Sequence, residues 1–136
     1  MGNLFGSCMC GSVQYEITGD CREIIACHCV ECRKSSGHFT AATATRPDNL
    51  VLLSNAGLKW YRASSMAQRG FCAECGSTLF WKPDSGDRVS VFVGSIDGDT
   101  GLELKAHIYV HEKGDYYRIE DDVEQHAKFG ANLSFT

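Results

Sequence analysis

Short runs of alternating hydrophobic and polar residues make up most of this chain, and glycine or polar residues separate them. The first clear run covers residues 13–18 and stops at Gly19-Asp20. Further β-prone runs lie at residues 23–29, 39–45, 49–53, 58–62, 77–81, 88–93 and 102–110. Alternation with a period of two, bounded by turn residues, is typical of strands. The pattern therefore predicts an all-β fold built from antiparallel sheets.

Helical spacing of apolar residues is brief in this sequence. We expect helix only directly after Cys32 and in the segment 123–129. The chain shows no internal repeat and no linker. With 136 residues it fits one domain covering residues 1–136, which is long enough to bury a hydrophobic core.

Composition and charge narrow the classes of function. Hydrophobic residues make up 43% and charged residues 22% of the chain, as in ordinary globular proteins. The formal net charge is −4, and six acidic residues lie between Glu112 and Glu124, so we expect no nucleic-acid partner. The first residues lack a signal-peptide pattern, and no run is long enough to span a bilayer. We therefore expect a cytoplasmic protein that does not bind membranes.

Eight cysteines carry the most specific chemistry in the sequence. In a reducing compartment thiols persist and disulfides are uncommon, so metal ligation explains them better. Six of the eight form C-x-C or C-x-x-C pairs, a seventh extends one of these pairs, and Cys21 stands apart. This spacing favours two metal sites.

One set of cysteines predicts a closed site. Cys8 and Cys10 form a C-x-C pair, and Cys72 and Cys75 form a C-x-x-C turn followed by glycine. Four thiolates fill the tetrahedral coordination of zinc and leave no position for a substrate. We expect this zinc to be structural and to tie the amino-terminal strand to the middle of the chain.

The other set has only three cysteines. Residues i and i+2 of a strand project to the same side, so Cys27 and Cys29 can bind one ion, and a turn through Val30 and Glu31 adds Cys32. If no protein group fills the fourth position, an exogenous ligand can do so, as in catalytic zinc sites. If Cys21 fills it, both sites are structural. The spacing leaves both alternatives open.

Residues beside this cluster are candidates for supporting roles. Alternation along the strand should point His28 away from the two neighbouring cysteines, toward the core. Arg33 and Lys34 follow Cys32, where cations can stabilise thiolates and hold an incoming carboxylate. An ordinary solvated turn accounts for the same two residues equally well.

Taken together, three segments resemble the glutathione-dependent formaldehyde-activating enzyme family. They are CMCGSV from Cys8, CHCVECRKSSG from Cys27 and RGFCAECGSTLFW from Arg69, and the resemblance continues through VGSID at 93–97, His107-Ile108 and Lys113. One departure is Asp115-Tyr116, where the family commonly has proline-tryptophan. The resemblance implies a β-tent fold of coiled antiparallel sheets with little helix.

The resemblance also implies two zinc ions per chain. It places a structural zinc on Cys8, Cys10, Cys72 and Cys75, and a catalytic zinc on Cys27, Cys29 and Cys32 whose fourth position is open. It implies a carbon–sulfur lyase that forms and cleaves S-hydroxymethylglutathione from glutathione and formaldehyde. Arg33 and Lys34 are then candidates to hold the glutathione carboxylates, and Ser36 can add a hydrogen bond. The alternative is a non-catalytic, zinc-stapled binding or interaction module of the same fold.

Overall fold

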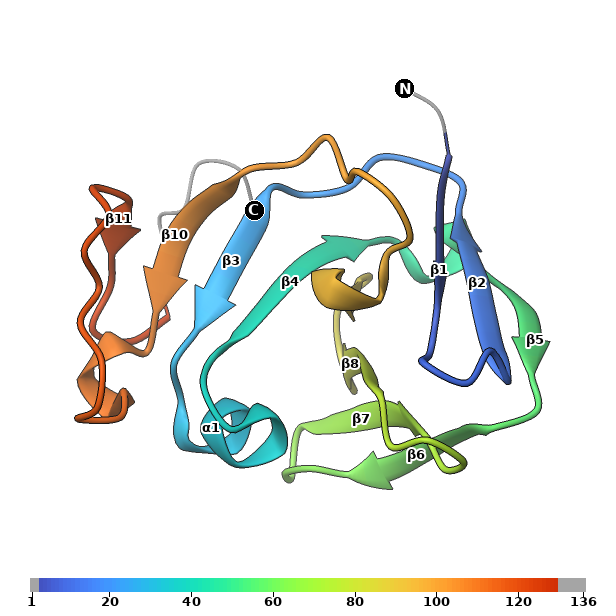
Figure 1. Cartoon of the computed structure of the whole chain (residues 1–136), viewed down its shortest axis with the longest axis horizontal. Helices are drawn as coiled ribbons and strands as arrows, with labels where there is room; N and C mark the ends of the chain where they lie inside the picture. Colours follow the sequence, from blue (N-terminus) through green and yellow to red (C-terminus); the bar gives the residue numbers. More distant parts are fainter. Residues whose placement is uncertain (1–2, 130–136) are drawn as a thin grey trace.

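The computed structural model describes residues 3–129 of the chain, and its strands form two sheets (Figure 1). The smaller sheet has the order β1-β2-β5, with bounds Leu4–Ser7, Val13–Ile17 and Leu50–Asn55. The larger sheet has the order β11-β10-β3-β4-β9-β8-β7-β6. Its strands in chain order are β3 (Ile24–Cys27), β4 (Thr40–Thr45), β6 (Leu58–Arg62), β7 (Ala67–Cys72), β8 (Thr78–Pro83), β9 (Val89–Phe92), β10 (Leu104–Ile108) and β11 (Glu124–Gln125).

Helical structure is sparse in the described residues. The α-helix α1 (Val30–Ser36) lies at the ends of β3 and β4 (Figure 1). Three short 3-10 helices cover Pro47–Asn49, Val93–Ser95 and Val110–Glu112. None of the helices in the described part of the chain has the length and apolar composition that crossing a bilayer requires.

The predicted all-β class is confirmed, and most predicted strands lie within two residues of an observed one. Two strand pairs depart from the antiparallel arrangement, because β10 pairs in parallel with both β3 and β11. The strands β1 and β7 were missed. The first has only four residues, and Arg69 and Gly70 interrupt the hydrophobic pattern of the second.

Both helix predictions need correction. The helix predicted to follow Cys32 begins before it instead, at Val30. The prediction of helix at residues 123–129 was wrong, because this segment pairs with the end of β10 instead. The His126 N–H donates to the His107 carbonyl at 2.8 Å, and the Val110 N–H donates to the His126 carbonyl at 3.1 Å. An isolated helix of seven residues is marginal in water, so these pairings decide its structure.

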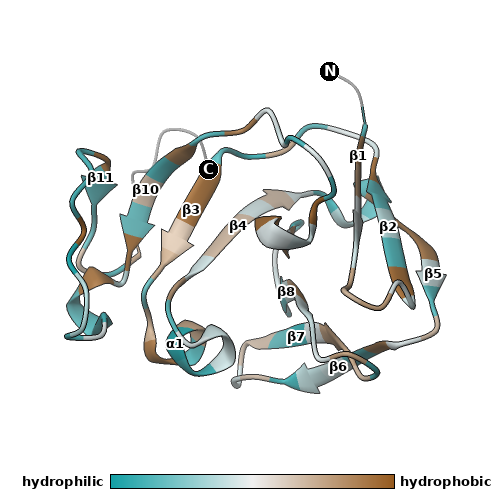
Figure 2. Cartoon of the chain, in the orientation of Figure 1, coloured by the Kyte–Doolittle hydropathy of each residue, from teal (hydrophilic) through white to brown (hydrophobic). Residues whose placement is uncertain are grey.

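A hydrophobic core lies between the small sheet and one face of β8 and β9. Tyr15 and Phe80, both fully buried, meet there edge to face with ring centroids 5.2 Å apart. The Tyr15 hydroxyl hydrogen-bonds the Ser95 hydroxyl at 2.5 Å, so its polar end is satisfied. A Cβ on Gly6 would lie 2.1 Å from the Tyr15 ring, which explains the glycine in β1. Figure 2 shows the hydrophobic character of β3 and the hydrophilic character of α1 and β11.

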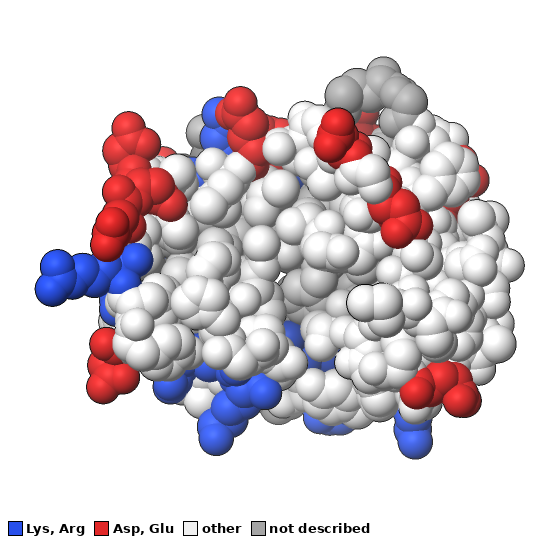
Figure 3. All heavy atoms as spheres, in the orientation of Figure 1, with Lys and Arg blue, Asp and Glu red and all other residues white. Residues whose placement is uncertain are grey.

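The other face of the larger sheet positions the functional site. Residues paired across neighbouring strands project from the same face of a sheet. Cys27 pairs with Thr40, Ile25 with Ala42, and Ala42 with Phe92, and Trp81 pairs with both Ser90 and Arg69. These side chains therefore share one surface, which α1 closes at one end. Lys, Arg, Asp and Glu lie mainly around the rim of the molecular face in Figure 3, whose centre is largely uncharged.

Candidate metal centres and ligand cavity

Four cysteines meet where the turn after β1 approaches the end of β7. The sulfurs of Cys8, Cys10, Cys72 and Cys75 all lie within 4.8 Å of one another. Cys10 Sγ lies 3.7 Å from Cys8 Sγ and 3.8 Å from Cys72 Sγ. Tetrahedral zinc with Zn–S bonds of about 2.3 Å has sulfur–sulfur edges of about 3.8 Å. The donor set and its spacing therefore fit a zinc ion.

Local backbone structure holds this four-cysteine group. Gly76 has φ 80° and donates its N–H to the Cys72 carbonyl at 2.7 Å, which closes the turn between the two cysteines. The Val13 N–H donates to Cys8 Sγ at 3.2 Å. A hydrogen bond with the Ser77 hydroxyl lowers the pKa of Cys75 to about 5. Such donors stabilise thiolates and orient them as metal ligands.

Three further cysteines meet at the start of α1. The sulfurs of Cys27, Cys29 and Cys32 lie within 4.8 Å of one another. Cys27 ends β3, Cys29 caps the helix, and Cys32 lies in its first turn. Cys29 Sγ accepts the Cys32 N–H at 3.4 Å. The predicted grouping is thus present, although Val30 and Glu31 form the first turn of a helix capped by Cys29 rather than a turn before the helix.

The three thiols of this group differ in acidity. Hydrogen bonds with Cys29 and Cys32 raise the pKa of Cys27. Hydrogen bonds from Cys27 and Cys29, with smaller contributions from Thr40 and Arg69, lower the pKa of Cys32 to about 2. We assign the negative charge to Cys32, because the Arg69 guanidinium lies against its sulfur.

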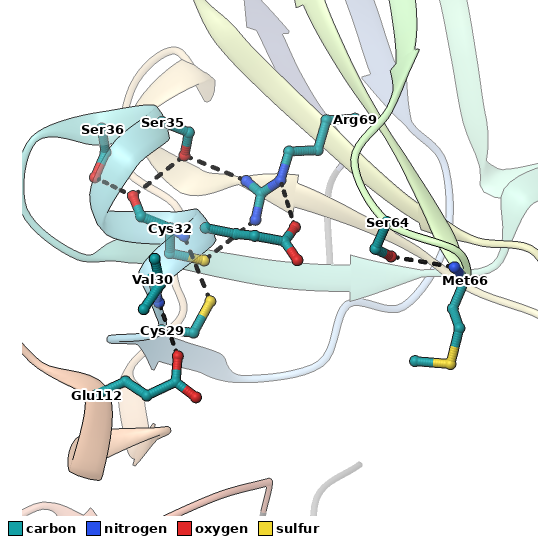
Figure 4. Close-up of polar contacts among 10 residues, drawn as sticks. Cys29, Val30, Cys32, Ser35, Ser36, Ser64, Met66, Arg69 and Glu112 are labelled. Atoms are coloured by element: carbon teal, nitrogen blue, oxygen red, sulfur yellow. Dashed lines mark hydrogen bonds and ion pairs between the residues drawn. The ribbon is translucent and has the colours of Figure 1, made fainter.

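Arg69 is a buried cation that the sequence analysis did not assign to the site. Only 4% of its side chain is exposed, and its Nη2 donates to Cys32 Sγ at 3.3 Å (Figure 4). Its Nη1 donates to the Ser35 hydroxyl at 3.4 Å, and its Nε lies 3.7 Å from Glu31 Oε1. Burial favours the neutral guanidine, but the interactions with Cys32, Tyr61 and Glu31 together outweigh it and raise the pKa of Arg69. The one feature of the sequence that could have indicated this role is that Arg69 begins the RGFCAEC segment, which resembles the family.

A cavity of about 740 Å³ opens beside the three-cysteine group. Its walls include the three cysteines, the paired residues of the sheet face and the residues that follow β10. Apolar walls come from Ile25, Trp81, Phe92, Ile108 and Tyr109, and cationic ones from Arg22, Arg69 and Arg88. None of the four cysteines of the other group lines this cavity. Of the two cysteine groups, it is the three-cysteine group that lines this cavity.

The structure separates the predicted ligand-contact residues from this cavity. Arg33, Lys34 and Ser36 lie on α1, but none of them lines it. The Ser36 hydroxyl donates to the Cys32 carbonyl at 2.7 Å and accepts the His38 N–H at 3.1 Å, so it is part of the helix end. Tyr116, at the departure from the family pattern, is exposed and does not line the cavity either.

Cys21 lies in neither cysteine group. It is partly buried against the hydrophobic core of Tyr15 and Phe80, as expected of a small apolar side chain. Within the described residues the three-cysteine group therefore has no fourth cysteine. None of the eight cysteines forms a disulfide in the structure.

His28 does not line the cavity that Cys27 and Cys29 face, as alternation along the predicted strand 23–29 suggested, although β3 itself ends at Cys27. It is fully buried, and its Nε2 lies 2.9 Å from His107 Nδ1 while its Nδ1 lies 2.5 Å from the Tyr117 hydroxyl. His107 Nε2 in turn lies 3.1 Å from both carboxylate oxygens of Asp121. Burial, together with His107, lowers the pKa of His28 to about 4. This network ties the backbone between the two cysteines to the carboxyl-terminal segment.

Comparisons with known proteins cover most of the chain. The model of the glutathione-dependent formaldehyde-activating enzyme family matches residues 3–112. A protein of Schizosaccharomyces pombe, named as an uncharacterized lyase, is 28% identical over 115 residues, which are 82% of this chain and 82% of that protein. The crystal structure of a Rhodobacter sphaeroides protein is similar with a TM-score of 0.56 and 26% identity. That likeness covers 71% of this chain and 91% of the other.

Proposed function

This chain belongs to the glutathione-dependent formaldehyde-activating enzyme family, and we propose that it is a zinc-dependent carbon–sulfur lyase acting on a glutathione-type thiol adduct. One observation carries the proposal. Three cysteine residues line a cavity, so a metal ion held by their sulfurs would leave a coordination position for a ligand from that cavity. The lyase named in Schizosaccharomyces pombe supports the reaction class.

Two zinc ions with different roles follow from the two cysteine groups. Cys8, Cys10, Cys72 and Cys75 would hold a structural zinc, since their four sulfurs complete its coordination. Cys27, Cys29 and Cys32 would hold the second zinc. When bound there, zinc lowers the pKa of a thiol that enters its free position, so that the thiol becomes a nucleophilic thiolate.

The residues around the three-cysteine group compensate the charge of its thiolates and form the walls of the cavity. Arg69 places a guanidinium against Cys32, which offsets the negative charge that the three cysteine thiolates and an incoming thiolate bring together. Phe92 lies under the same guanidinium, with the Arg69 Cζ 5.6 Å from the ring centroid. The apolar walls limit water around the reacting sulfur.

The proposed reaction is balanced without an added oxidant or reductant. The thiol sulfur bonds to the carbonyl carbon of formaldehyde, and the proton lost by the thiol appears on the former carbonyl oxygen. The product is S-hydroxymethylglutathione. The reverse reaction cleaves the same carbon–sulfur bond and releases both components.

The test compares reaction rates with and without an intact three-cysteine group. We expect the zinc-loaded protein to accelerate exchange between glutathione, formaldehyde and S-hydroxymethylglutathione, measured by NMR above the uncatalysed rate. Cys29→Ser should lose one zinc and this acceleration, whereas Cys21→Ser should retain two zinc ions and full activity. Glutathione binding without any acceleration would instead support the non-catalytic binding module.

We also propose that glutathione contacts three residues of α1, namely Arg33, Lys34 and Ser36. Their place on α1 beside Cys32 supports it, and their absence from the cavity wall weighs against it. Lys34→Gln tests it directly, because Lys34 is exposed and its loss should raise the KM for glutathione only if it contacts the ligand.

A further inference from the structure

Two arginines line the end of the cavity away from α1. Arg22 precedes β3, and Arg88 precedes β9, so they come from distant parts of the sequence. Both line one cavity, and burial, together with the charge of Arg88, lowers the pKa of Arg22 to about 10. Two cations that line one cavity repel each other unless an anion lies between them.

No protein carboxylate within residues 3–129 makes an ion pair with either arginine. The acids that line the cavity have other partners: Asp84 pairs with Arg62 at 2.6 Å, Glu31 lies 3.7 Å from Arg69, and Glu112 accepts the Val30 N–H at 2.9 Å. The Arg22 side chain donates only to backbone carbonyls, those of Glu23 and Ala42. Arg88 lies over the Phe129 ring at 5.9 Å.

Strand register places this pair relative to the cysteines. Cys27 pairs with Thr40, and two residues further along the same strands Ile25 pairs with Ala42. The Arg22 Nη2 donates to the Ala42 carbonyl at 3.0 Å, so its guanidinium lies at this second pair. Two residues of a strand span about 7 Å, which sets the separation along the sheet between the three-cysteine group and the Arg22 guanidinium. Arg88 precedes Val89, which pairs with Thr45, so it approaches the cavity from farther along the sheet.

We propose that Arg22 and Arg88 form a carboxylate subsite that selects thiols whose carboxylate lies at least one residue beyond the cysteine. Arginine holds a carboxylate through paired, charge-assisted hydrogen bonds, and a ligand carboxylate would relieve the repulsion between the two cations. The proposal rests on the proposed function, because the thiol end of the ligand is taken to enter the three-cysteine site.

The separation of about 7 Å between the three-cysteine group and the Arg22 guanidinium defines the shortest ligand that fits. Each residue of extended chain adds about 3.5 Å, so a glycine after cysteine extends the carboxylate toward the arginines. Glutathione and cysteinylglycine both have this arrangement. Free cysteine is one residue shorter, and 2-mercaptoethanol carries no carboxylate.

A matched ligand pair tests the subsite with the unaltered, zinc-loaded protein. Calorimetric titration compares cysteinylglycine with its carboxyl-terminal amide, which has nearly the same shape and the same thiol but no negative charge. We expect the acid to bind about tenfold more tightly, the lower end of the effect of a hydrogen bond between charged groups. Free cysteine should bind no better than the amide.

Variants then assign the effect to particular residues. Arg88→Gln and Arg22→Gln should each reduce the advantage of the acid over the amide and leave binding of the amide unchanged. Lys105→Gln is the control with the same change of charge, because Lys105 is exposed, pairs with Glu103 at 2.7 Å and does not line the cavity. It should retain the full advantage of the acid.

Each contrary result has a distinct meaning. Equal binding of acid and amide by the unaltered protein would overturn the subsite and leave the proposed function intact. Failure of either ligand to bind would overturn both. An advantage that persists in both arginine variants, or that disappears equally in Lys105→Gln, would show that these two arginines do not recognise the carboxylate.

Discussion

Arg69 links the larger sheet to the three-cysteine group through one buried contact. Its guanidinium is enclosed by Cys32, Ser35 and Phe92, and only 4% of its side chain is exposed. A buried charge next to a thiolate is costly to remove, because the remaining anion then lacks a counter-charge. Arg69 therefore contributes to the electrostatics of the site as well as to packing.

Replacement of Arg69 tests this role. We expect Arg69→Gln to weaken zinc binding at the three-cysteine group by about 1.5–3 kcal/mol, the range for a hydrogen bond to a charged group. Competition with a chromophoric chelator measures the affinity. Arg69→Lys keeps the positive charge, so its zinc affinity should lie between those of the unaltered protein and Arg69→Gln. Equal zinc affinity in all three proteins would show that Arg69 is only a packing residue.

Tyr15 gives the core a predictable dependence on pH. Burial, only partly offset by the hydrogen bond with Ser95, raises the pKa of Tyr15 to about 12. The unfolded chain loses this proton near pH 10, and the folded chain retains it, so stability falls as the pH rises from about 10 toward 12. The free energy of unfolding should decrease by about 2–3 kcal/mol across this range. Urea titrations at several pH values measure it, and Tyr15→Phe should remove most of this decrease.

The element that completes the three-cysteine group is the first turn of α1. Glu112, in the 3-10 helix after β10, accepts the Val30 N–H at 2.9 Å, so a segment distant in sequence fixes the start of the helix (Figure 4). Cys29 caps the same turn through its sulfur. The position of Cys32 relative to Cys27 thus depends on contacts at the helix start as well as on local sequence.

Removal of the Glu112 contact should loosen this turn. We expect Glu112→Ala to lower the free energy of unfolding by about 1 kcal/mol, as for loss of a capping residue. Zinc affinity at the three-cysteine group should fall as well. Glu112→Gln is the matched control, since its amide oxygen can still accept the Val30 N–H. A larger loss with glutamine than with alanine would contradict this account.

At the scale of the whole molecule, the fold depends more on the four-cysteine group than on the three-cysteine group. The four-cysteine group joins the turn after β1 to the end of β7, and so connects the smaller sheet to the larger one. The three-cysteine group joins β3 to the adjacent α1. Loss of a metal from the first group should therefore affect the fold more than loss from the second.

Metal removal can separate these roles. We expect about two zinc ions per chain, and a moderate chelator should first remove the ion from the three-cysteine group, which has fewer protein ligands. Circular dichroism should then change little, and removal of the second ion should lower the thermal midpoint by several degrees or more. Atomic emission spectroscopy measures the stoichiometry. If the protein unfolds when the first zinc is removed, the zinc that is lost first is the structural one, which would contradict this assignment.

The sequence by itself determined the fold class and the two cysteine groups. Alternation of hydrophobic residues is a local property, and it located eight of the eleven strands between Leu4 and Gln125. The C-x-C and C-x-x-C spacings are local too, so they brought Cys27 together with Cys29 and Cys72 together with Cys75 without knowledge of the fold. Alternation likewise placed His28 on the opposite face from its neighbours.

Only the tertiary structure decided what surrounds the three-cysteine group. Arg22, Arg69 and Arg88 come from three separate segments, and the tertiary structure brings them to the walls of one cavity. It also turned residues 123–129 into a partner of β10 rather than a helix and placed Cys21 against the core. Contacts between residues far apart in sequence leave no periodic pattern along the chain. The cysteines were therefore predictable, whereas the cations and walls of their cavity were not.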